Sequence, residues 1–137
     1  MPLSSNLEPI NPEAASLAGM HILLVEDSWH VGMALKSLLQ ALGASVAGPA
    51  ATTADAERLI DERTPEVAIV DYSLRGGEQA GSLIEKLGRR GVRVIVISGY
   101  EEVPLALGSM PLILQKPVVE SQLLAALLPA ARRTASA

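Results

Sequence analysis

Short apolar runs alternate with amphipathic stretches along most of the chain. The runs are rich in Val, Ile and Leu, as β-strands are, and the stretches between them carry apolar residues every three or four positions, as helices do. Strands that alternate with helices indicate repeated βα units around a parallel sheet, and therefore an α/β fold. The five predicted strands cover residues 21–25, 44–47, 67–70, 92–97 and 112–115.

The helical stripes differ in strength. The first stripe predicts a helix that ends at Gly43 and buries Val31, Leu35, Leu38 and Leu42. A second helix opens at a capping residue, Thr52, and a third follows the 67–70 strand. The fourth, at 101–110, is a poor helix because Pro104 and Gly108 interrupt it. The fifth is rich in leucine and is expected to end before Pro129.

Length and composition suit one domain of about 110 residues with two short flanks. We expect residues 1–19 to be an N-terminal extension, flexible or weakly helical, residues 20–130 to form the domain, and residues 131–137 to be a C-terminal tail. The net charge of −4 and the absence of long basic runs argue against nucleic acid as the main partner. Without cysteine, a signal peptide or a membrane-spanning run, the expected protein is cytoplasmic, with no disulfide and no membrane partner.

Polar residues stand at the ends of four of the five predicted strands. Glu26 and Asp27 follow the first, Asp71 the third, Ser98 the fourth and Lys116 the fifth. Because the carboxyl ends of parallel strands share one edge of a sheet, these side chains are expected to meet there. Three carboxylates so close together would repel one another unless a cation intervened, and Mg²⁺ (or Mn²⁺) prefers such oxygen ligands.

With a cation in place, the other residues acquire chemical roles. One carboxylate could attack a phosphorus atom and form an aspartyl phosphate. The Lys116 ammonium would offset charge on the phosphoryl oxygens, and the Ser98 hydroxyl could donate a hydrogen bond to one of them after transfer. That contact would draw the loop after Ser98 inward.

Taken together, these residues resemble the receiver domain of bacterial response regulators, and the resemblance covers residues 20 to about 130. It implies a flavodoxin-like fold, in which a doubly wound sheet of five parallel strands in the order 2-1-3-4-5 is flanked by five helices. It also implies that Asp71 is the phosphoacceptor. Glu26, Asp27 and the backbone carbonyl of Ser73 would bind the metal ion together with Asp71.

The resemblance assigns Ser98 as the switch hydroxyl and Lys116, which precedes a proline, as the family's lysine. The run Val96 to Tyr100 is similar to a subclass of stand-alone receivers whose fourth strand ends Phe-Ala-Thr-Gly-Tyr. Common receivers carry a switch aromatic three residues before the lysine, where this chain has Ile113. Our hypothesis is that Tyr100 takes its place as a switch residue.

The function implied is that of a single-domain response regulator. It would accept a phosphoryl group on Asp71 from a histidine kinase or a histidine phosphotransfer protein, and signal by protein–protein contact or by onward transfer in a phosphorelay. It would not be an enzyme in the sense of turning over a substrate. A homodimer formed through the fourth and fifth helices would also be consistent with the resemblance.

Three alternatives are weighed against this function. A phosphohydrolase with an aspartate nucleophile usually needs a second aspartate two residues later, where this chain has Ser73. A flavodoxin-like cofactor binder needs a phosphate-binding loop after the first strand, where this chain has two acids that repel phosphate. A degenerate receiver that acts only as a scaffold stays open.

Overall fold

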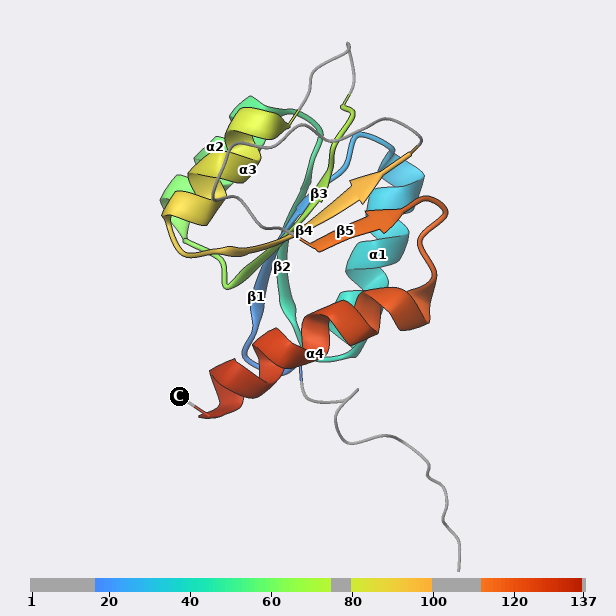
Figure 1. Ribbon diagram of the computed structural model, residues 1–137, viewed down its shortest axis with the longest axis vertical. Coiled ribbons are helices and arrows are strands. Elements are labelled where there is room, and N and C mark those ends of the chain that lie inside the picture. Colours follow the sequence, from blue (N-terminus) through green and yellow to red (C-terminus); the bar gives the residue numbers. More distant parts are fainter. Residues whose placement is uncertain (1–16, 75–79, 100–111, 137) are drawn as a thin grey trace, which may run out of the picture.

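The computed structural model describes residues 17–74, 80–99 and 112–136, with side chains described up to residue 128. Within these residues, five parallel strands form one sheet in the order β2-β1-β3-β4-β5 (Figure 1). This confirms the doubly wound topology predicted from the sequence. The strands are β1 (His21–Val25), β2 (Ser45–Ala50), β3 (Val67–Asp71), β4 (Arg93–Ser98) and β5 (Leu112–Gln115).

Helices cover both faces of the sheet. In Figure 1, α2 and α3 lie on one face, and α1 and α4 lie on the other. Their bounds are α1 (Trp29–Ala41), α2 (Thr53–Glu62), α3 (Gly81–Arg89) and α4 (Glu120–Ser136). The label α4 thus belongs to the last of the five predicted helices. The weak helix predicted at 101–110 lies outside the described residues, and with it one half of the predicted dimer surface.

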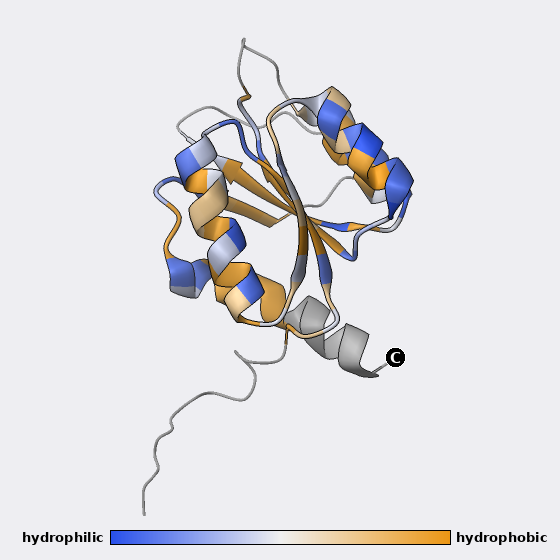
Figure 2. Ribbon diagram, turned by 180° about the vertical axis from the view of Figure 1, so that it is seen from behind, coloured by the Kyte–Doolittle hydropathy of each residue, from blue (hydrophilic) through white to orange (hydrophobic). Residues whose placement is uncertain are grey.

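Side chains of alternate strand residues enter two separate apolar layers, because successive residues of a strand point to opposite faces. Leu23, Ala68 and Val94 pack with α2 and α3. Ile22 and Ile95 pack with α1 and α4. Figure 2 shows this arrangement: apolar residues follow the strands and the inner sides of the helices, and polar residues lie outside. Strands buried on both faces hold their ends firmly, which is what a site built there requires.

The buried face of α1 differs from the predicted stripe. Leu39 is fully buried, and Leu35 and Leu42 pack against the same core, but Val31 is 47% exposed. The buried residue of the first turns is instead Gly32, which faces Pro49 of β2. Apolar spacing could not identify a glycine as the point of closest approach, so the predicted burial of Val31 was wrong.

Two element boundaries also differ from the prediction. Strand β2 runs on to Ala50 instead of ending near Ala47, with a bulge between the residues that pair with Leu23 and Val25. Helix α4 continues past Pro129 to Ser136. Proline removes a single backbone donor, and the residues that follow it in the sequence include alanines and arginines, which favour helix. None of the helices in the described ranges combines the length and the apolar character needed to cross a bilayer.

The revised face of α1 can be tested by unfolding measurements. Leu39→Ala should lower the free energy of unfolding by about 2–5 kcal/mol, because it leaves a cavity in a sealed layer. Val31→Ala should change it by less than about 0.5 kcal/mol, because Val31 is largely exposed. Urea denaturation of both variants measures the difference. Equal losses in the free energy of unfolding would show that Val31 is buried, as the apolar stripe predicted.

Candidate metal centre

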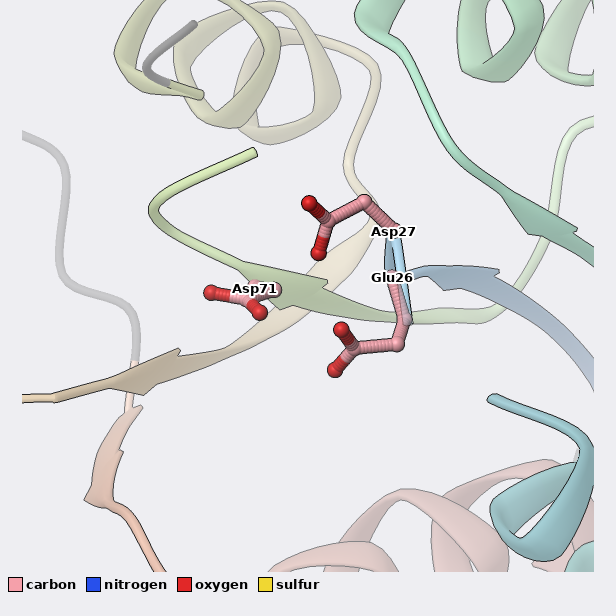
Figure 3. Close-up of side chains that lie close together, drawn as sticks. All are labelled: Glu26, Asp27 and Asp71. Carbon is pink, nitrogen blue, oxygen red and sulfur yellow. The ribbon is translucent and has the colours of Figure 1, made fainter. Parts of the chain in front are cut away.

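Three acidic side chains meet at the carboxyl edge of the sheet. Glu26 and Asp27 directly follow β1, and Asp71 is the last residue of the neighbouring strand β3. Each offers a carboxylate oxygen, and these oxygens all lie within 4.8 Å of one another (Figure 3). Glu26 and Asp71 are buried, at 5% and 1% exposure, and Asp27 is partly buried. The structure thus brings together the three carboxylates that the sequence singled out.

Both carboxylate oxygens of Asp71 accept hydrogen bonds. The Lys116 ammonium donates to Oδ2 over 2.9 Å, and the backbone N–H of Ser73 donates to Oδ1 over 3.1 Å. The Asp71 side chain is 2% exposed, whereas that of Lys116 is 45% exposed. The Asp71 carboxylate is therefore held in place and shielded from solvent, whereas the lysine that contacts it is partly exposed.

Glu26 carries the cost of this crowding. Burial is the main reason why its pKa is raised to about 7, and the charge of Asp71 adds to the rise. The backbone N–H of Ser28 donates to Glu26 Oε2 over 3.0 Å and opposes the shift, as does Lys116 more weakly. The raised pKa thus reports mainly that Glu26 is removed from water and, to a smaller extent, that it lies beside the negative charge of Asp71.

A hard divalent cation fits this donor set. Lys116 offsets one of three negative charges that lie close together, and the proton on Glu26 offsets part of another. Carboxylate oxygens are the ligands that Mg²⁺ and Mn²⁺ prefer, so either ion could replace that proton. The backbone N–H of Ser73 is hydrogen-bonded to Asp71, which holds this residue beside the cluster. The Ser73 carbonyl remains a predicted metal ligand.

Ser98 and Lys116 stand at the same edge of the sheet. Ser98 is the last residue of β4 and is 2% exposed. The residue before it, Ile97, is the register partner of Asp71, so Ser98 lies beside the end of β3. The backbone N–H of Lys116 donates to the Ser98 carbonyl over 2.8 Å, which ties the end of β5 to the end of β4. Tyr100, the other predicted switch residue, lies outside the described residues.

A pocket of about 730 Å³ adjoins the carboxylates, between α1 and the segment that follows β5. Its polar part is contributed by Glu26, Asp27, Ser28 and Lys116. The Ser28 hydroxyl also caps α1 by accepting the backbone N–H of Val31. Neither this cap nor the apolar wall was predicted from the sequence, although a serine directly after an acidic pair is a recognisable helix cap. The apolar wall includes Val31, Ala34, Leu35, Ile97, Pro117 and Val118.

Comparison with known proteins points to a single family. Residues 22–128 match the family model described as the response regulator receiver domain. A search of curated proteins finds no match.

Solved structures of similar fold include both single receivers and longer proteins. SdrG from Sphingomonas melonis Fr1 is 29% identical, with a TM-score of 0.69 over 85% of this chain and 98% of that one. The receiver domain of Erythrobacter litoralis PhyR is 26% identical, with a TM-score of 0.70 over 83% and 91%. A Bartonella quintana PhyR variant, described as an anti-anti-sigma factor, is 19% identical, with a TM-score of 0.75 over 92% and 54%. The chain spans about half the length of the longer PhyR chains that it matches.

Binding of a divalent cation should depend on pH because of Glu26. Below about pH 7 this carboxyl group holds a proton that the ion must displace, so Mg²⁺ affinity should rise with pH, by up to roughly tenfold per unit below pH 7. Calorimetric titration between about pH 6 and about pH 8 measures this slope.

The matched variant is Glu26→Gln, which cannot ionise. It should bind Mg²⁺ more weakly at every pH and with a flatter pH profile. A wild-type affinity that does not change over the same range would contradict the proton competition.

Proposed function

Because the chain belongs to the response regulator receiver domain family, we propose that it accepts a phosphoryl group on Asp71 from a phosphohistidine of a kinase or phosphotransfer protein. The observation that carries the proposal is the contact of a buried carboxylate, Asp71, with the Lys116 ammonium inside an acidic cluster. An acidic cluster without the lysine would indicate metal binding only, and a lysine without the cluster would indicate an ordinary surface ion pair. Phosphoryl chemistry is indicated by the two together.

In the proposed reaction, a carboxylate oxygen of Asp71 attacks the phosphorus atom. The new oxygen–phosphorus bond forms as the phosphorus–nitrogen bond of the donor phosphohistidine breaks, and the released imidazole nitrogen takes up a proton. Asp71 is held by two hydrogen bonds and shielded from water, so little reorganisation is needed before attack. Lys116, 2.9 Å from the nucleophile, is close enough to pair with an oxygen of the incoming phosphoryl group.

Glu26 and Asp27, with Asp71 and the Ser73 carbonyl, would hold Mg²⁺ or Mn²⁺. The ion, when bound, would offset negative charge on the phosphoryl oxygens and on the attacking carboxylate. The adjoining pocket leaves room for a side chain of the donor protein to approach this edge.

After transfer, the Ser98 hydroxyl would donate a hydrogen bond to a phosphoryl oxygen and so shift the loop that begins at Gly99. We propose that a protein partner reads this change, or that the phosphoryl group is passed onward. Tyr100 would couple phosphorylation of Asp71 to binding of the partner. The similarity to PhyR, described as an anti-anti-sigma factor, makes an anti-sigma protein one candidate for the partner.

Phosphorylation should depend on Asp71. Incubation with Mg²⁺ and acetyl phosphate should add one phosphoryl group to the wild-type protein, and hydroxylamine should remove it, as expected for an acyl phosphate. Asp71→Asn should show no adduct in the intact mass spectrum. Asp61→Asn is a matched control, because Asp61 is an exposed aspartate of α2 that pairs with Arg90, and it should react like wild type.

Other outcomes of this experiment identify the alternatives. A wild-type protein that binds Mg²⁺ but gains no adduct would be a scaffold of the degenerate kind. Continued release of phosphate from an added phosphoester would instead identify a hydrolase.

The role of Lys116 can be separated from metal binding. Lys116→Met should lower the rate of adduct formation by roughly 100-fold, because a cation near the transferring group is lost. It should leave Mg²⁺ affinity unchanged or higher, since a positive charge is removed beside the carboxylates. Lys86→Met, which removes an ion pair between α3 and α2, is the control. A Lys116→Met protein that reacts at the wild-type rate would refute the role.

A further inference from the structure

Strand β2 contains a bulge next to the metal centre. Leu23 of β1 pairs with Ala47 and Val25 pairs with Ala50, so β2 uses one residue more than β1 over this step. The extra length falls at Gly48 and Pro49. Gly48 has a φ of +99°, and a Cβ there would lie 2.4 Å from the Leu24 carbonyl oxygen, so only glycine fits.

Helix α1 contacts this bulge at two points. The Lys36 ammonium donates a partly buried hydrogen bond to the Gly48 carbonyl over 2.9 Å. One turn earlier, Gly32 lies so close to Pro49 that a Cβ on the glycine would be 2.7 Å from the proline ring. The bulge and the helix are therefore fastened together by a polar contact and by close packing.

The fastened bulge in turn holds Glu26. The residue after Pro49, Ala50, accepts the backbone N–H of Glu26 over 2.9 Å. On the other side, a Cβ on Gly32 would lie 3.7 Å from Glu26 Cγ, so the stem of the glutamate borders the same glycine that receives Pro49. The backbone of Glu26 is thus bonded to the bulge, and its side chain borders Gly32 of α1. The hydrogen bond of Lys36 connects this helix to this bulge.

We propose that Lys36 is a positioning residue of the metal centre. Its hydrogen bond to Gly48 fixes the bulge, and the bulge fixes Glu26 relative to Asp27 and Asp71. Mg²⁺ tolerates little departure from octahedral geometry, so a small displacement of one carboxylate weakens binding. This inference rests on the proposed function, in which the three carboxylates hold the ion.

The test is a Mg²⁺ titration of Lys36 variants. Trp29, the sole tryptophan, is 66% exposed and two residues from Asp27, so its fluorescence can report binding, with calorimetry as a second readout. Lys36→Met should weaken Mg²⁺ binding by up to roughly tenfold, the lower end of the effect of losing a direct hydrogen-bond partner of a metal ligand, because Lys36 acts on Glu26 through the bulge. Lys36→Arg keeps a donor for the Gly48 carbonyl and should recover most of the affinity.

Two further variants guard the interpretation. Lys86→Met, which removes a lysine far from the bulge in sequence, should bind Mg²⁺ like wild type. Pro49→Ala, which removes the ring against Gly32, should weaken binding in the same direction as Lys36→Met. Urea denaturation of each variant establishes that it is folded at the titration temperature.

The outcomes separate this inference from the function beneath it. Weaker binding in Lys36→Met with recovery in Lys36→Arg supports the positioning role. Wild-type affinity in Lys36→Met, even with lower stability, overturns it and leaves Lys36 as a simple tie between helix and sheet. Failure of the wild-type protein itself to bind Mg²⁺ would instead refute the proposed metal centre, and this inference with it.

Discussion

Electrostatic repulsion among three carboxylates is the constraint on which the site depends. Parallel pairing of β1 with β3 brings the ends of both strands to one edge. The carboxylates of Glu26, Asp27 and Asp71 therefore lie close together. Two of these groups are buried, so solvent screens them poorly. The Lys116 ammonium and the raised pKa of Glu26, which favours its neutral form, reduce the repulsion without removing it. The fold thus maintains a deficit of positive charge that a cation can fill.

The apolar layers are what make this charge arrangement possible. Strands β1, β3 and β4 are buried on both faces, so the residues at their ends stand on a rigid support. Lys116 follows the edge strand β5, whose side chains are more exposed. The carboxylates are consequently held by buried strands, and the Lys116 ammonium beside them is the charged group that is partly open to solvent. This difference in exposure suits a site that binds a charged group from solution.

Apolar periodicity was sufficient to predict the strands and helices, and the shared edge of parallel strands predicted that the carboxylates meet. The order of the strands came from the resemblance to receiver domains. The sequence was insufficient for the α1–β2 contact. Gly32 and Gly48 carry no hydrophobic signal, and their importance comes from a helix and a bulge that approach each other only after folding. Lys36 was overlooked for the same reason: a lysine on a helix looks solvated until its acceptor is known.

If Asp71 carries the phosphoryl group as we propose, the same geometry bears on how long the group stays there. Hydrolysis of an acyl phosphate needs a water molecule placed in line and a base to activate it. The residue two positions after Asp71 is Ser73, whose hydroxyl is a poor base near neutral pH, and Asp71 itself is almost fully shielded from solvent. Ser73 therefore does not supply the base that a carboxylate at this position would supply. A phosphoryl group that stays bound serves as a signal, whereas one that is lost at once is a turnover intermediate. If Asp71 is phosphorylated, a serine in place of an acid at position 73 is one feature that would slow the loss.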